Sequence, residues 1–195
     1  MEKTNKLTGK DLINVGIYTA MTLAVFFVIG MLTVLPVLYP VLLFIFPLFC
    51  GIPMMLYYTK IRKFGMLTIM GILIGIFFFL IGYTWIGLFF WAAGGFAADL
   101  MLLPGHYQSF KFTLLSYAVF SLGMIGCPAP MWFAGQAYWD NVSDSMGEQY
   151  ASSLSSIMPP WMFYAGLGIL LVGGVCGALV GRKMLKKHFQ RAGIV

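Results

Sequence analysis

Charge is the scarcest property of this sequence. Only 9% of its 195 residues are charged, while 61% are hydrophobic; soluble domains carry about a quarter charged residues. This shortage excludes an ordinary soluble globule and a disordered chain. The three cysteines are too few for a disulfide scaffold and lie in or beside apolar runs, so we interpret Cys50, Cys127 and Cys176 as small packing residues.

Recognisable catalytic and metal-binding patterns are also missing. No apolar run contains paired carboxylates, an HExxH pattern or a Cys/His cluster at metal spacing, and the chain lacks a phosphate-binding GxxxxGK[ST] pattern. His106 and His188 have polar or basic neighbours and are expected to be solvated. We therefore expect that the protein is not an enzyme and holds no metal or cofactor. We also expect that it does not bind nucleic acid.

Long apolar runs are what the sequence does contain. A membrane-spanning helix needs about 20 mostly apolar residues. Between residues 64 and 103 the only charge is Asp99, and as a single helix this run would measure about 60 Å, so it must turn back, most simply at Gly82-Tyr83-Thr84. The predicted fold is an all-α integral membrane protein with six spans, at residues 12–34, 41–58, 64–81, 85–103, 109–127 and 161–181. The first run is too long for a signal peptide, so we expect it to be retained.

The basic residues predict the orientation of these spans. With six spans, all 12 lysines and arginines fall beside the N-terminus, the 59–63 loop, the 104–110 loop or the C-terminus. Because basic residues concentrate on the cytoplasmic side, both termini are predicted to be cytoplasmic.

The remaining long segment, residues 128–160, is predicted to be an external loop. It contains acidic residues and several tryptophans and tyrosines, and a loop of this length usually serves as a lid, a binding loop or a linker. Its aromatic content argues against disorder. An interfacial aromatic belt is the alternative interpretation of these rings.

Two features within the spans have both structural and functional interpretations. Asp99 lies near the cytoplasmic end of its run, where it could reach water, cap backbone groups, pair with Lys111, or couple transport to an ion. Small residues recur at steps of four at Gly16, Ala20 and Ala24, and again at Gly173, Gly177 and Gly181. Such stripes let another helix approach closely, usually within the same protein.

Several stretches resemble the Trep_Strep (MptD-type) family of substrate-binding S components of energy-coupling factor (ECF) transporters. They are LTGKDLI (7–13), ADL (98–100) with GHYQS (105–109), YAVFSL (117–122), GEQYA (147–151) and GRKMLKKHFQRAGI (181–194). The resemblance implies a single membrane domain that captures a vitamin or related micronutrient from outside. It further implies docking on the membrane protein EcfT, which works with two ATPases, through Gly16, Ala20 and Ala24. For the second stripe, packing inside the protein is the preferred interpretation.

The resemblance also implies a pocket at the outer ends of the last three spans and their external loops. It selects Tyr39, Trp85, Phe89, Phe120, Met124, Trp132, Gln136, Trp139, Asp140, Asn141, Trp161 and Tyr164. Rings with a few polar groups suit a flat, partly apolar ligand. Because no lysine or arginine is external, strongly anionic ligands are disfavoured.

Three alternatives stay open. Haem or another tetrapyrrole is a variant ligand, whose axial ligation would have to come from Met or Tyr because the external half lacks histidine. A second alternative is a stand-alone enzyme or an ion-coupled carrier that uses Asp99. The third is a structural or assembly subunit whose 128–160 segment contacts another protein.

Overall fold

The computed structural model describes residues 7–189, with side chains up to Lys187, and its regular elements within that range are all helical. The main helices are α1 (Gly9–Gly30), α2 (Tyr39–Tyr58), α3 (Met66–Leu80), α4 (Trp85–Leu102), α5 (Phe110–Ser121), α6 (Pro130–Phe133), α7 (Gln136–Met146), α8 (Glu148–Ile157) and α9 (Met162–Met184). The 3-10 turns η1 (Met31–Val34), η2 (Pro36–Leu38), η3 (Leu103–Gly105) and η4 (Leu122–Gly126) and the π-helical η5 (Leu185–Phe189) extend or join them.

Six of these elements are apolar and coincide closely with the predicted spans. By length and composition, four described helical segments could cross a membrane: Gly9–Val34, Pro36–Tyr58, Trp85–Gly105 and Met162–Lys187. Met66–Leu80 and Phe110–Gly126 are apolar but shorter. The turn between α3 and α4 contains Gly82, whose φ of 102° is a conformation that side-chain-bearing residues rarely adopt.

Residues 128–160 depart from the predicted loop, because the structure folds them into α6, α7 and α8. In α8 the buried residues Ala151 and Leu154, followed by Met158, recur at helical spacing, while the serines between them are mostly exposed. This amphipathic pattern explains the helix. Gly147, with φ of 92°, lies between α7 and α8 and permits the sharp reversal there.

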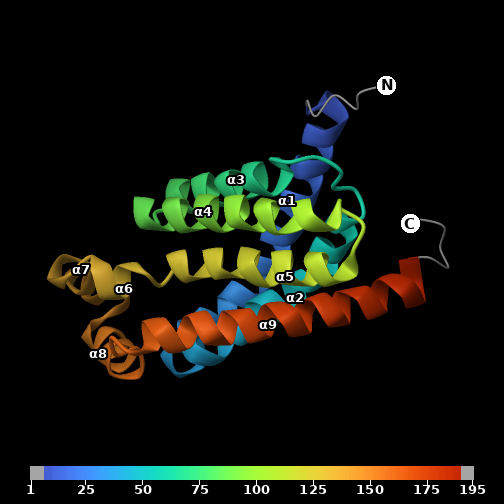
Figure 1. The fold of residues 1–195 in the computed structure, drawn as a ribbon. Coiled ribbons are helices and arrows are strands. Elements are labelled where there is room, and N and C mark those ends of the chain that lie inside the picture. The colour runs from blue at the N-terminus through green and yellow to red at the C-terminus, as the bar shows by residue number, and fades with distance from the viewer. Residues whose placement is uncertain (1–6, 190–195) are drawn as a thin grey trace.

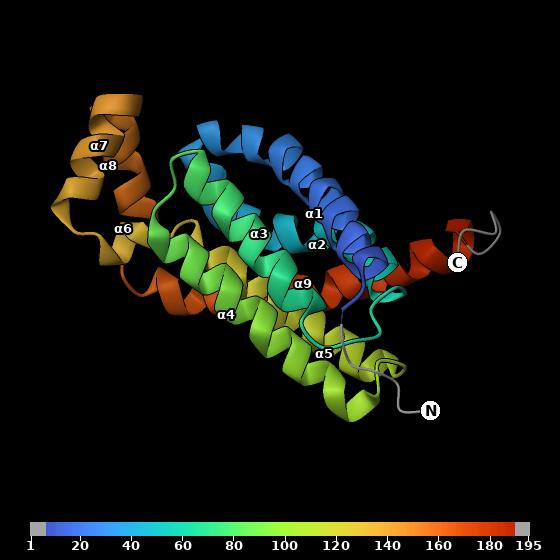
Figure 2. The same ribbon diagram turned by 90° about the horizontal axis from the view of Figure 1, so that it is seen from above.

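The apolar helices form a bundle with α6, α7 and α8 gathered at one end (Figure 1). The start of α1, the loop between α2 and α3, and the end of α9 lie at the other end. Viewed from above, α1 crosses obliquely over the bundle (Figure 2). The most extensive pairings join α2 to α9 and α3 to α4.

Glycines let α2 and α9 approach closely, which agrees with the preferred interpretation of the second small-residue stripe. A Cβ atom added to Gly177 would lie 2.2 Å from the Pro47 carbonyl oxygen, and one added to Gly181 would lie 2.3 Å from that of Gly51. Both obstacles are backbone atoms, which cannot turn aside as a flexible side chain can. Gly173 likewise faces Pro47 and Phe44.

Asp99 is fully buried and caps the first turn of α3. Its carboxylate accepts hydrogen bonds from the backbone N–H groups of Gly65, Leu67 and Thr68 at 3.1, 3.3 and 2.8 Å, and from the Thr68 hydroxyl at 2.6 Å. The first N–H groups of a helix have no intrahelical partner, and a negative charge there opposes the helix dipole favourably. Of the sequence-based alternatives for Asp99, backbone capping is the one observed.

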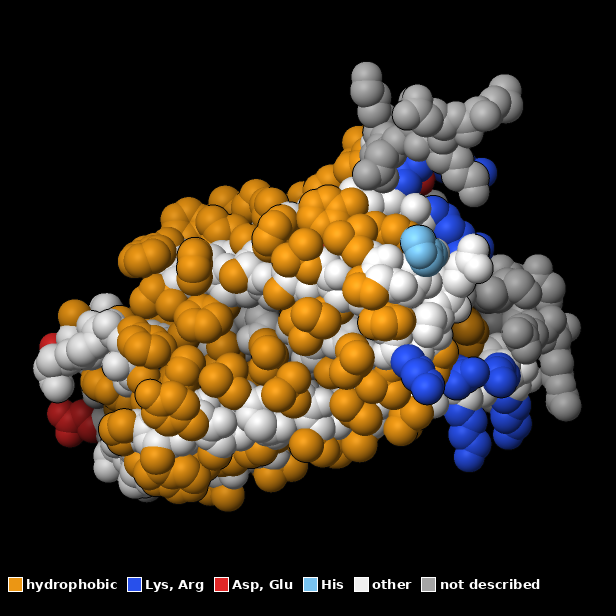
Figure 3. Space-filling view, in the orientation of Figure 1, with side chains coloured by type: hydrophobic (Ala, Val, Ile, Leu, Met, Phe, Trp, Pro, Cys, Tyr) orange, Lys and Arg blue, Asp and Glu red, His pale blue; other side chains and the backbone are white. Residues whose placement is uncertain are grey.

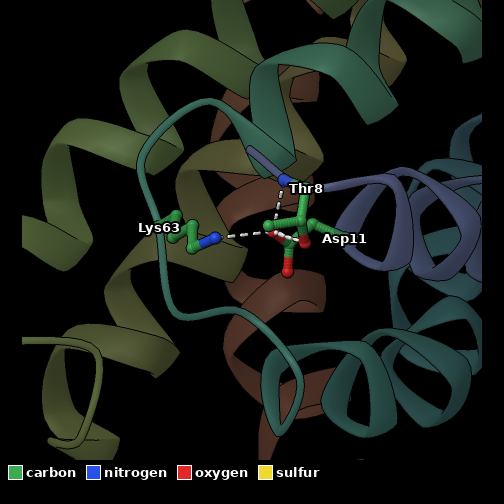
Figure 4. A network of polar contacts seen from close by, with 3 residues as sticks. All are labelled: Thr8, Asp11 and Lys63. Carbon is green, nitrogen blue, oxygen red and sulfur yellow. Dashed lines mark hydrogen bonds and ion pairs between the residues drawn. The ribbon is translucent and has the colours of Figure 1, made fainter. Parts of the chain in front are cut away.

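The basic residues gather at the end of the bundle opposite α6–α8 (Figure 3). Lys63 pairs with Asp11 at 2.8 Å, and Asp11 also accepts hydrogen bonds from the backbone and hydroxyl of Thr8 (Figure 4). Nearby, the Arg182 guanidinium lies 3.8 Å from the centre of the Phe110 ring. The first contact joins the start of α1 to the α2–α3 loop, and the second joins the end of α9 to the start of α5. Lys3, Lys6 and Arg191 lie outside the described residues, as does the side chain of His188.

We predict that Gly177→Ala strongly destabilises the protein because the added methyl group would collide with the backbone of α2. The expected loss is about 2–4 kcal/mol of unfolding free energy. Gly168→Ala is the matched control, because a Cβ there meets nothing within 4 Å. It should be neutral or slightly stabilising, since alanine favours helix more than glycine does. Equilibrium unfolding in mixed micelles measures both, and equal losses would contradict this account of the α2–α9 contact.

Replacing Asp99 should weaken the start of α3. Asp99→Ala leaves three backbone N–H groups without their acceptor, for an expected loss of about 2–4 kcal/mol, whereas Asp99→Asn keeps one acceptor oxygen and should lose less. Asp140→Asn, an exposed change on α7, serves as the control. Hydrogen exchange of residues 65–69 locates the effect. Unchanged exchange in Asp99→Ala would show that the carboxylate does not stabilise this turn.

Candidate binding cavity

A cavity of about 310 Å³ opens between the helices at the end of the bundle near α6–α8. It lies where α1 and α3 end, α2 begins and η4 follows α5. Its lining residues are Phe26, Phe27, Gly30, Met31, Thr33, Tyr39, Leu42, Leu43, Phe46, Phe78, Ile81, Tyr83, Met124, Cys127, Pro128 and Leu170. Ligand pockets usually measure about 300–1,000 Å³, so this cavity suits a small molecule.

Aromatic rings from three helices form one wall of the cavity. Phe26 of α1 stacks on Phe46 of α2 with ring centres 4.9 Å apart, and meets Phe78 of α3 edge-on at 5.5 Å. Phe78 in turn meets Tyr83 edge-on at 5.2 Å. Rings fixed in this way offer both faces and edges to a flat ligand at little further entropic cost.

The polar groups of the lining are uncharged. Tyr39, Tyr83 and Thr33 contribute hydroxyls and Cys127 contributes a thiol, while no acidic, basic or histidine side chain belongs to the lining. Although 38% of its area is exposed, the burial of the rest of Tyr83 raises its pKa to about 12, with smaller contributions from Cys127, Tyr138 and Tyr150. The Tyr83 phenol therefore stays protonated at physiological pH and can act as a hydrogen-bond donor.

The α6–α8 segment is attached beside this cavity by two sets of hydrogen bonds. The Tyr150 hydroxyl of α8 donates to the backbone carbonyl of Thr33 at 2.7 Å. The Trp132 indole N–H donates to the carbonyls of Met158 and Pro159 at 3.2 and 3.1 Å. The first links the segment to η1, whose Thr33 lines the cavity, and the second joins α6 to the junction before α9.

Two of the twelve sequence-predicted pocket residues, Tyr39 and Met124, line the cavity. Phe120 is buried in the core, with its ring 5.7 Å from that of Trp91. Four others lie on the outer surface with 62–75% of their area exposed, namely Trp85, Phe89, Trp161 and Tyr164. This exposure is what the belt interpretation expects of aromatic residues near the membrane interface.

The remaining predicted pocket residues lie in α6 and α7. Trp132 packs on Phe163, and Trp139 on Tyr138. Three polar residues are exposed on α7: Gln136 donates to Asp140 at 3.1 Å, and Asn141 donates to the Ala137 carbonyl at 2.9 Å. The structure does not bring these five residues to the cavity lining.

Most of the cavity wall was not anticipated from the sequence. Phe26, Phe46 and Phe78 lie within uninterrupted apolar runs, where nothing distinguishes a cavity wall from a packed core. A usable signal in the sequence is the presence of hydroxyls at the helix ends near α6–α8, because Thr33 follows α1 and Tyr83 follows α3. Tyr83 was considered only as part of a turn.

Gly16, Ala20 and Ala24, the predicted docking residues, are all exposed on α1. A Cβ atom added to Gly16 would meet nothing within 4 Å. This stripe is thus open along the helix, in contrast to the glycine stripe of α9, which is filled by α2.

A bundle of membrane-length apolar helices, whose described charges apart from the buried Asp99 lie at its two ends, is the architecture of an integral membrane protein. The chain belongs to the Trep_Strep family, described as hypothetical bacterial integral membrane proteins, whose sequence profile it matches over residues 9–191. No curated protein and no solved structure matches it significantly. The profile match confirms membership of the Trep_Strep family, while the S-component role that the resemblance implies stays a prediction.

Removing the Tyr150 hydroxyl should loosen the attachment of α8. Tyr150→Phe deletes one hydrogen bond worth about 0.5–1.5 kcal/mol, so exchange of protected α8 amides should accelerate by about two- to tenfold. Tyr138→Phe is the control within the same segment, since no hydrogen bond of its hydroxyl is found among the described residues. Equal exchange in the two variants would mean that the bond does not hold α8.

Proposed function

We propose that the protein is the substrate-binding S component of an ECF-type importer in the bacterial cell membrane. It captures a vitamin or related micronutrient from outside and docks on EcfT, which with two ATPases supplies the energy. The observation that carries this proposal is the small, uncharged, ring-lined cavity at the end of the bundle opposite the basic residues. Family membership supports membrane location, and the transport role is our inference.

The proposal places both termini in the cytoplasm and the cavity on the outer side. The described basic residues lie at one end of the bundle, while Asp140, Asp144 and Glu148 lie on α7 and α8 at the other. Since lysine and arginine concentrate in cytoplasmic loops, the basic end faces the cytoplasm. The cavity then opens towards the source of the nutrient.

Six spans are part of the same proposal. At about 1.5 Å per residue, α3 measures about 22 Å and Phe110–Gly126 about 26 Å, less than a hydrocarbon core of about 30 Å. Both are flanked by long helices, and local thinning of the bilayer accommodates short spans at modest cost. An even number of spans also keeps the basic loops on one side.

The open stripe on α1 supports docking on a partner helix. Gly16, Ala20 and Ala24 lie one turn apart on an exposed face, so a helix of EcfT could approach closely there. Asp99, the candidate for an ionisable relay among residues 7–189, is committed to four hydrogen bonds at the start of α3. This arrangement favours energy supply by partners over ion coupling through Asp99.

Co-purification tests the docking proposal directly. EcfT and two ATPases should co-purify with the tagged chain from native membranes, and Ala20→Leu or Ala24→Leu should reduce their recovery at least about tenfold, because a bulky side chain separates the helices. Ala93→Leu, which changes an exposed alanine on α4, is the matched control. Recovery unaffected by all three variants would refute the α1 docking face, and isolation of the chain without ATPases would refute the S-component role.

A further inference from the structure

The two tyrosines of the cavity differ from the buried tyrosines of the helix bundle in lacking hydrogen-bond partners. Tyr57 donates to the Met66 carbonyl at 2.9 Å, Tyr58 pairs with Ser116 at 2.8 Å, and Tyr117 donates to the Pro47 carbonyl at 2.6 Å. For the hydroxyls of Tyr39 and Tyr83 no such partner is found within residues 7–189. Tyr39 is half-buried and Tyr83 is 38% exposed, so their hydroxyls can bond to a guest molecule or to water in the cavity.

Other polar atoms of the cavity are already used within the protein. The Thr33 hydroxyl donates to the Gly30 carbonyl at 2.6 Å, and the Thr33 carbonyl accepts the bond from Tyr150. The Cys127 thiol is at best a weak donor. Recognition by strong hydrogen bonds therefore falls to Tyr39 and Tyr83, which enter from the start of α2 and the loop after α3.

The lining also restricts the charge that a guest can have. No charged side chain belongs to it, so an ionised group inside would lose its hydration without gaining a counter-ion. The α6–α8 segment does not supply a cation either, because the charged residues of α7 and α8 are Asp140, Asp144 and Glu148. A neutral guest avoids this cost, whereas the carboxylates of a tetrapyrrole or the phosphate of a coenzyme would incur it.

From these observations we infer that the cavity binds a small, uncharged ring compound, whose body lies against Phe26, Phe46 and Phe78 and whose acceptor atoms bond to Tyr39 and Tyr83. This inference names the ligand class of the proposed S component and rests on that function for its meaning in transport. The binding itself is a property of the isolated chain. A volume of about 310 Å³ equals about ten water molecules, which matches one or two small rings.

Two sets of probes of nearly constant shape test the charge requirement. Nicotinamide is neutral, nicotinate is an anion and 1-methylnicotinamide is a cation, while pyridoxine and pyridoxine 5′-phosphate differ only by a phosphate group. Calorimetric titration of the full chain in lipid nanodiscs should show binding of at least one neutral probe below about 1 mM. Its charged counterparts should bind at least tenfold more weakly.

Two conservative variants test the donors. Tyr39→Phe and Tyr83→Phe keep the rings and remove only the hydroxyls, so each should weaken the neutral probe about three- to tenfold. Tyr107→Phe, in the loop at the opposite end of the bundle, is the control and should bind like the native protein. Circular dichroism and unfolding midpoints confirm that each variant is folded.

Three outcomes would overturn the inference: a charged probe that binds as well as its neutral counterpart, a neutral probe unaffected by both tyrosine variants, or no neutral probe that binds. A Soret band that appears on addition of haem and disappears in Tyr39→Phe or Tyr83→Phe would instead favour the tetrapyrrole. The titrations use the isolated chain and do not depend on the ATPases, so either experiment can fail while the other succeeds. The two proposals can therefore be refuted separately.

Discussion

The cost of placing an unpaired charge or an unsatisfied backbone group in a hydrocarbon environment governs this structure. Apolar helices satisfy their own backbone groups, and nearly all charges lie at the two ends of the bundle. Asp99 is the informative exception, because it is buried with no basic partner among residues 7–187 and instead accepts hydrogen bonds from the first turn of α3. The first turn of α3 has N–H groups that need acceptors, and the buried carboxylate of Asp99 needs donors. Each thus provides the hydrogen-bond partners of the other.

The same constraint explains which parts of the fold could be predicted. Long apolar runs have few alternatives to membrane helices, so the positions of the six apolar segments and the turn near Gly82 follow from length and composition. The helices in 128–160 were missed because Ala151, Leu154 and Met158 are too sparse among serines to stand out as an amphipathic pattern. The partner of Asp99 was also inaccessible to sequence, because the donors lie more than 30 residues earlier in the chain.

The cavity was harder to predict than the fold, and two comparisons show why. Phe26 of the cavity wall and Phe120 of the core both lie in apolar runs, and only their packing separates them. Trp161 and Tyr164 combine a ring with a polar tip, which suits ligand binding but is also what a membrane interface selects. Composition therefore identifies the end of the bundle at which a ligand could bind without identifying the residues that face it.

Small residues show a similar limit of sequence analysis, because their spacing does not reveal whether another helix covers them. Gly173, Gly177 and Gly181 share their spacing with Gly16, Ala20 and Ala24, yet α2 fills the first stripe and nothing covers the second within the described chain. Helix α1 is thereby exposed on one side, while Phe26 and Gly30 of the same helix line the cavity. The stripe proposed for docking and one wall of the cavity therefore belong to the same helix, so the proposed capture and docking steps share α1 as a common element.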